Sequence, residues 1–154
     1  MPIRDFPFTR IHSDDVPRPW LPICISNPAT GLSQNAYGLI DTGADECAFP
    51  ASYASLLGHN LQAGTEKTIK TGNGITTAYS HACSITILSL HGEPAITIDE
   101  TLIDFMPNLY VVLLGVKSFL NRFILTINYP SQIFSNQGPC FASKSPGPAL
   151  SSRY

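Results

Sequence analysis

One carboxylate in the sequence stands where an apolar segment gives way to a run of small residues. Residues 37–45 read YGLIDTGAD, so Asp41 follows an apolar strand and precedes Thr42, Gly43 and Ala44. A strand would hold this carboxylate rigidly at its end, and the amides that follow could donate hydrogen bonds to it. Gly43 would let the backbone turn tightly and approach a ligand, while Ala44 leaves room for a substrate chain. These features suit a catalytic acid–base carboxylate; an Asx turn, which is common at strand ends, is the simpler alternative.

The other residue types that could do chemistry form no recognisable site. No G-x-S-x-G sequence is present, and Gly72 and Gly74 belong to a predicted hairpin rather than to a phosphate-binding loop. The histidines lack the spacing of metal ligands: His12, His59, His81 and His91. The cysteines are far apart without a CxxC pair, as expected for reduced, buried thiols: Cys24, Cys47, Cys83 and Cys140. We therefore expect no metal and no cofactor.

Short apolar and alternating segments predict a mostly β body that would position Asp41. The pattern predicts strands over residues 20–26, 35–40, 67–71, 75–87, 93–102, 109–114, 123–128 and 132–135. Short helical segments are predicted over residues 50–57, led by a proline, and 116–121. Gly72-Asn73-Gly74 is a strong hairpin signal between two of the strands.

The composition is that of a globular protein of about one domain. The chain has 154 residues, of which 44% are hydrophobic and 13% charged, with a formal net charge of -2. A weak negative charge argues against nucleic acid or an anionic membrane as a partner. The apolar run over residues 109–114 is too short to span a bilayer, and the N-terminus lacks the apolar segment of a signal peptide. We therefore expect a cytoplasmic protein.

Prolines mark the predicted boundaries of the folded body. Six of the 13 prolines fall within residues 1–28, and the last residues are rich in Gly, Pro and Ser. We expect an extended N-terminal arm over residues 1–18, a folded domain over residues 19–135 and a flexible C-terminal tail over residues 136–154.

The motif and the order of these elements resemble the retropepsin-type aspartic proteases, the single-domain relatives of retroviral proteases. Residues 39–45, LIDTGAD, followed by a short Pro-led helix, are most similar to the soluble bacterial members. Gly72-Asn73-Gly74 stands where this family has its flap. Residues 111–115, VVLLG, and then a helical turn and a strand, follow in the family order. The resemblance covers residues 19–135.

The resemblance implies an all-β fold, a closed acid-protease barrel with a flap hairpin and one or two short helices, in a symmetric homodimer. Proteases of this kind hydrolyse a peptide bond in an extended polypeptide with two carboxylates that share a proton. The chain has a single Asp-Thr-Gly. The other acids do not supply the second carboxylate, because Asp99 and Asp104 lack a following Thr/Ser-Gly and residues 14–15 lie in the arm. Two copies of the chain would therefore each supply Asp41.

By the same resemblance, the residues around the catalytic carboxylate take supporting roles. Thr42 would bond across the dyad to the partner chain, and Gly43 would offer its carbonyl to the substrate backbone. Leu39, Val111 and Leu113 would form walls of the substrate pocket and favour apolar residues near the cleaved bond; core packing is the alternative for these three. The flap would close over the substrate and exclude water, although its sequence alone would also suit a surface turn.

The resemblance also bears on the interface between subunits. The arm and the segment after Phe134 are expected to join a sheet between the two subunits, as family termini do. In retroviral relatives, the Asp at the place of Asp45 pairs with an Arg directly after the second glycine. Here Val116 holds that place, with Lys117 next and Arg122 further on. The ion pair is thus altered or moved, or Asp45 simply faces solvent.

Two other functions stay open on the sequence. A protein with this fold could keep the site and bind peptides as a scaffold, while cleaving them weakly or not at all. A β-domain could also contain the Asp-Thr-Gly turn by chance, in which case Asp41 would lie far from any twofold axis. The intact LIDTGAD segment favours the protease.

Overall fold

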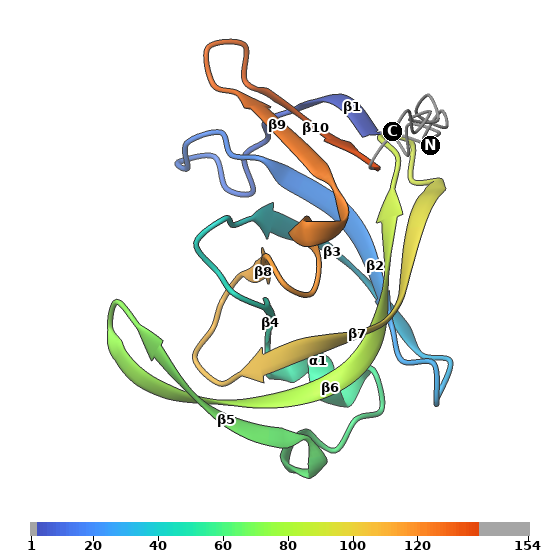
Figure 1. Ribbon diagram of the computed structural model, residues 1–154, viewed down its shortest axis with the longest axis vertical. Helices are drawn as coiled ribbons and strands as arrows, with labels where there is room; N and C mark the ends of the chain where they lie inside the picture. Colours follow the sequence, from blue (N-terminus) through green and yellow to red (C-terminus); the bar gives the residue numbers. More distant parts are fainter. Residues whose placement is uncertain (1–2, 139–154) are drawn as a thin grey trace, which may run out of the picture.

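Ten strands and three short helices form the part of the chain, residues 3–138, that this computed structural model describes (Figure 1). The strands are β1 (Ile3–Pro7), β2 (Trp20–Ser26), β3 (Ser33–Ile40), β4 (Cys47–Pro50), β5 (Thr65–Thr71), β6 (Gly74–Leu88), β7 (Pro94–Met106), β8 (Val112–Leu114), β9 (Ile124–Asn128) and β10 (Ile133–Gln137). The helices are α1 (Ser52–Leu56) and the 3-10 turns η1 (Leu61–Ala63) and η2 (Leu120–Arg122). From residue 139 onward, the predicted tail lies outside the described residues.

Six of the strands close into a barrel. They follow one another in the order β2-β3-β8-β4-β7-β6, and a pairing between β2 and β6, from Ile23 opposite Ile87 to Ser26 opposite Ser84, closes the ring. Closure removes the free sheet edges that would otherwise pair with other chains. β5 pairs with the first half of β6 and extends this sheet as a hairpin. The predicted all-β closed barrel with a flap hairpin and short helices is thus confirmed.

The core follows from the alternation that the sequence shows. Along β2, Leu21, Ile23 and Ile25 are fully buried, and Ile85 and Ile87 of β6 face them across the barrel closure. Because successive side chains of a strand point to opposite faces, every second residue enters the same core. This packed interior is the frame on which the Asp41 loop is held.

Several element boundaries differ from the prediction for local reasons. The strand expected over residues 109–114 is only Val112–Leu114, because Asn108 takes a left-handed φ of 66° and Tyr110 is 90% exposed. β7 continues four residues beyond residue 102, to Met106, since its last residues pair with β4 (Cys47 opposite Ile103) as well as with β6. The segment predicted as helical over residues 116–121 forms turns that end in η2.

A second, three-stranded sheet has the order β1-β10-β9. Phe6 pairs with Phe134, and their rings lie 5.8 Å apart between centroids, so the beginning of the arm packs on its own chain. Both edges of β10 are occupied by strands of the same chain. β10 therefore has no free edge for a partner chain, and the sheet between subunits expected from the sequence stays a prediction that would use the outer edge of β1 or β9. β10 also extends to Gln137, two residues beyond the predicted domain boundary.

Candidate active site

Asp41 lies directly after a strand that is bonded on both sides. β3 runs parallel to β8, with Ile40 opposite Leu114, and the Asp41 N–H donates to the Leu114 carbonyl at 3.2 Å. The chain then turns, with the Ala44 N–H donating to the Asp41 carbonyl at 3.3 Å, and returns as β4 on the other side of β8. The loop that carries the carboxylate is therefore anchored at both ends to one short central strand (Figure 1).

The carboxylate of Asp41 is half-buried and has one hydrogen-bond donor within its own loop. The Gly43 N–H donates to Asp41 Oδ1 at 2.9 Å. Among the described residues, Oδ2 has no hydrogen-bond partner. One oxygen is thus fixed by the backbone, while the other can accept a hydrogen bond from a water molecule or share a proton with a second carboxyl group.

Gly43 and Gly115 lie where the backbone comes so close to other atoms that a side chain would press on them, and neither has a positive φ. A Cβ at Gly43 would lie 3.3 Å from Asp41 Oδ1, so a larger side chain would press on the carboxylate. A Cβ at Gly115 would overlap the Glu46 carbonyl group and would lie 2.8 Å from the Ala44 carbonyl oxygen. The sequence predicted a close backbone approach at Gly43, yet the tighter crossing is at Gly115, where the chain leaving β8 passes the Asp41 loop.

An open cleft of about 720 Å³ lies against the Asp41 loop. It is bounded by the loop itself, by β5 of the flap hairpin, and by Asp104 and Met106 at the end of β7. Among the predicted site residues, it brings together Asp41, Gly43, Ala44, Gly72 and Leu113. A second cavity, of about 420 Å³, lies between β1, β2, β3 and the β6–β7 turn and has no carboxylate, histidine or cysteine in its lining. Of these two cavities, only the Asp41 cleft has carboxylates in its lining.

The remaining predicted site residues lie around this cleft without lining it. Thr42 is exposed at the tip of the loop, and Leu39 is half-buried in register beside Leu113. Val111 is 39% exposed on the segment before β8. Asn73 lies in the turn at the tip of the hairpin, and Gly74, with a φ of 118°, is the first residue of β6. The tip is further held by Thr71, whose Oγ1 accepts a hydrogen bond from the Asn73 N–H at 3.3 Å.

No family model matches the sequence, and no curated protein is similar to it in sequence. In structure, the chain is similar to a retropepsin-like aspartic protease from Rickettsia conorii, with 20% identity, a TM-score of 0.57, and coverage of 84% of this chain and 97% of that one. The chain has a retropepsin-like fold. It also aligns with the protease of EIAV, solved in complex with the inhibitor HBY-793, over 70% of this chain and 88% of that one, with 20% identity and a TM-score of 0.40.

Within this retropepsin-like fold, backbone hydrogen bonds join the Asp41 loop to the segment after β8. The Val116 N–H donates to the Ala44 carbonyl at 2.9 Å, and the Lys117 N–H donates to the Asp45 carbonyl at 2.7 Å. The side chain of Asp45 is exposed and forms no ion pair with any residue between 3 and 138. Of the alternatives that the sequence left open, the one found within the described residues is an Asp45 side chain that faces solvent.

The wall of the cleft contains an ion pair that was not predicted from the sequence. Lys67 Nζ of β5 lies 2.9 Å from Asp104 Oδ1 of β7, and the Asp104 side chain is only 4% exposed. The sequence carried one signal for it, an acidic residue at position 104 within the otherwise apolar stretch from Ile103 to Met106. A carboxylate is rarely buried unless it has a partner, but the identity of that partner could not be predicted.

Two of the cysteines, Cys47 and Cys83, are buried. Burial raises the pKa of Cys83 to about 12 and that of Cys47 to about 11, so both thiols are protonated at neutral pH. Both are free, as expected. Cys83 lies 3.3 Å from His59 Nε2, but no group of three or more possible metal ligands occurs within residues 3–138. No helix in that range is long and apolar enough to cross a membrane.

Proposed function

We propose that the protein is an aspartic endopeptidase in which Asp41 of two subunits forms the catalytic dyad. The observation that carries the proposal is the position of Asp41, which lies in an open cleft under the flap strand of a retropepsin-like fold. Its carboxylate keeps one oxygen free, as a group that activates water must.

The need for a second subunit follows from the acids near Asp41. Two carboxyl groups at hydrogen-bonding distance share a proton because both cannot ionise cheaply. Among the described residues no other carboxylate is bonded to Asp41, and Asp104 is already bound by Lys67. A twofold axis beside the Asp41 loop would supply the second carboxylate from an identical chain.

An exposed apolar surface near the loop fits such an axis. Its large members are Ile75 at the flap tip, 72% exposed, Tyr110, 90% exposed, and Val111 and Val116, 39% and 38% exposed. Figure 1 shows the flap tip, the β7–β8 segment and the β3–β4 loop on the same side of the barrel. Apolar groups gathered on one face of a protein often mark an interface, and a second copy would cover this one.

The proposed mechanism uses one protonated and one ionised Asp41, which titrate as a unit. The ionised group takes a proton from a water molecule as the water oxygen attacks the scissile carbonyl carbon. The protonated group donates to the carbonyl oxygen, which becomes a hydroxyl of the tetrahedral diol. The C–N bond then breaks as a proton passes to the leaving nitrogen, and no covalent acyl-enzyme forms.

The surrounding residues would orient the peptide. In this proposal, the carbonyl of Gly43 accepts a hydrogen bond from the substrate backbone, and Thr42 braces the dyad across the axis. Leu113 forms an apolar wall beside the bound chain, and Leu39 and Val111, which lie around the cleft of one chain, would add to the walls of the site shared by two subunits. The hairpin with Gly72-Asn73-Gly74 at its tip closes over the extended peptide and excludes water.

The test is cleavage of a synthetic peptide library at about pH 4–7, a range typical of carboxylate dyads. We expect products from the wild-type protein, inhibition by pepstatin-like hydroxyl isosteres, and a loss of about 100-fold or more in Asp41→Asn. Asp99→Asn is the matched control, because Asp99 is an exposed carboxylate on β7 outside the cleft. Tight peptide binding by the wild type without any product would instead support the scaffold function.

A further inference from the structure

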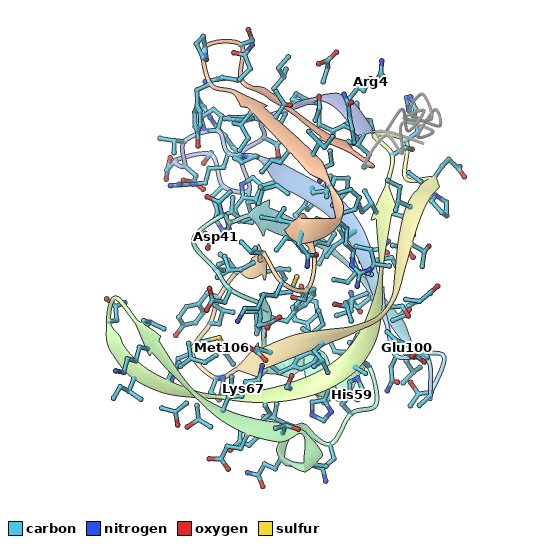
Figure 2. All side chains as sticks on the ribbon, viewed as in Figure 1. Arg4, Asp41, His59, Lys67, Glu100 and Met106 are labelled. Carbon is cyan, nitrogen blue, oxygen red and sulfur yellow. The ribbon has the colours of Figure 1, made fainter. Side chains whose placement is uncertain are left out.

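The wall of the Asp41 cleft contains a pair of opposite charges that each keep free hydrogen-bonding capacity. Lys67 and Asp104 both line the cleft and are joined at 2.9 Å through Asp104 Oδ1. Figure 2 shows Lys67 and Met106 next to each other inside the curve of the long strands, with Asp41 above them. An ion pair in this place faces whatever chain the cleft binds.

The sheet register explains how two residues from non-adjacent strands meet. Lys67 is opposite Ala78 and Asp104 is opposite Ser80, and both of these partners are on β6. Since positions 78 and 80 are two residues apart, they share a face of the sheet with Lys67 and Asp104. The small side chain of Ala78, which is fully buried, lets Lys67 reach across the middle strand.

Lys67 and Asp104 use only some of their hydrogen-bond donors and acceptors within the described part of the chain. Asp104 Oδ2 has no hydrogen-bond partner among residues 3–138, and an ionised carboxylate accepts through both oxygens. Lys67 Nζ has three donors, and within the described part of the chain it uses one of them, on Asp104. On the same face, the buried hydroxyl of Ser80 also has no hydrogen-bond partner. The cleft wall therefore presents an acceptor and a donor side by side.

We propose that Lys67 and Asp104 form a subsite that selects a carboxamide side chain, Gln or Asn, in the substrate. This inference rests on the proposed function, because it assigns the specificity of the same cleft. The amide NH₂ of the substrate donates to Asp104 Oδ2, and its C=O accepts from Lys67 Nζ. A carboxamide is the side chain that carries a donor and an acceptor together without a net charge.

Other side chains fit this pair less well. A substrate Lys or Arg would put a second cation on a carboxylate that Lys67 already neutralises, and a substrate Asp or Glu would bring a second anion to Asp104. An aliphatic side chain would cover Asp104 Oδ2 and leave it without a partner, which is costly for a buried polar atom. The subsite thus departs from the apolar preference that the sequence suggested for the residues near the cleaved bond.

The experiment measures both binding and cleavage. The substrates are sets of fluorescent decapeptides that differ only by Gln, Leu, Lys or Glu at one position. Their affinity is measured with the Asp41→Asn protein, and their cleavage is measured with the wild-type protein. At one position, we expect Gln to exceed Leu, Lys and Glu by about tenfold in affinity and in kcat/KM. Lys67→Met/Asp104→Leu, which replaces the pair by apolar side chains, is expected to reverse the preference to Leu at that position.

Lys70→Met is the matched control. Lys70 lies on the same strand and also lines the cleft, but it forms no ion pair with any described residue. The ratio of Gln to Leu is expected to stay at the wild-type value in this variant. The inference is overturned if no position prefers Gln, or if the double variant keeps the wild-type ratio. Failure of the proposed function gives a different result, in which peptides bind with a Gln preference and none is cleaved.

Discussion

Gly115 passes so close to the carbonyl group of Glu46 that no side chain fits between them. This contact is where the chain leaving β8 crosses the end of the Asp41 loop, two positions before Lys117 bonds the Asp45 carbonyl. Backbone groups therefore hold the Asp41 loop in place. Its geometry depends on a glycine 74 residues further along the chain.

Gly115→Ala is expected to lower the free energy of unfolding by about 1–3 kcal/mol, the usual cost of an over-packed site. The backbone atoms at this contact cannot move aside as a flexible side chain would, so the loop must shift. Chemical denaturation measures the loss. Gly72→Ala is the control, because a Cβ at Gly72 meets no atom within 4 Å. An equal stability of both variants would contradict this role of the contact.

The sequence predicted best what depends on local pattern. The strand over residues 20–26 has the predicted limits because its alternation is complete. The Asp41 turn was evident because a carboxylate followed by small residues is unusual after an apolar strand. The hairpin at Gly72-Asn73-Gly74 forms because Gly74 supplies the positive φ that the turn requires.

The features that escaped prediction depend on contacts between distant residues. Lys67 meets Asp104 across an intervening strand, and no local pattern encodes that register. Tyr110 and Val111 were predicted within a buried strand because they are apolar, yet both are exposed. Composition alone does not tell whether such residues enter the core of one chain or lie at its surface.

Lys67→Met is expected to destabilise the protein by about 1–3 kcal/mol, less than for a fully buried pair because the Lys67 side chain is 34% exposed. The substitution leaves Asp104 buried without its cation. Asp104→Leu added to Lys67→Met removes this unpaired charge and is expected to restore most of the loss. Urea denaturation of the single and double variants measures both effects. A double variant that is less stable than Lys67→Met would contradict this account.

The stability of the fold is expected to fall in mild acid because of His59. Burial, and then the neighbouring His81, lower the pKa of His59 from its ordinary value of 6.5. Its Nδ1 lies 3.4 Å from the amide nitrogen of Asn27, which can only donate, so the folded protein favours a neutral ring. Below about pH 6.5 the unfolded chain binds this proton more readily than the folded one, and stability decreases as pH falls through that range.

The measurement for His59 is the free energy of unfolding between about pH 7.5 and 5. His59→Gln should show a shallower decrease than the wild type, since it removes the group that gains a proton on unfolding. His91→Gln is the matched control, because His91 is exposed in the β6–β7 turn and should leave the slope unchanged. Parallel pH profiles for the wild type and His59→Gln would show that this histidine is not responsible.

Tyr110→Asp is expected to weaken the proposed dimer without unfolding the chain. Tyr110 is 90% exposed, so the barrel loses almost no packing, whereas a charge on the apolar face opposes the approach of a second copy. Sedimentation should show the wild type shifting, as concentration rises, toward twice its mass of 16.7 kDa, and the variant remaining a monomer at those concentrations.

Peptide cleavage by Tyr110→Asp should recover at high protein concentration, because a dyad shared between subunits follows the dimer population. Leu90→Asp, also at an exposed apolar residue (60%) but in the β6–β7 turn, should sediment and cleave as the wild type does. If the rate of cleavage per mole of Tyr110→Asp did not depend on protein concentration, a single chain would be sufficient for cleavage.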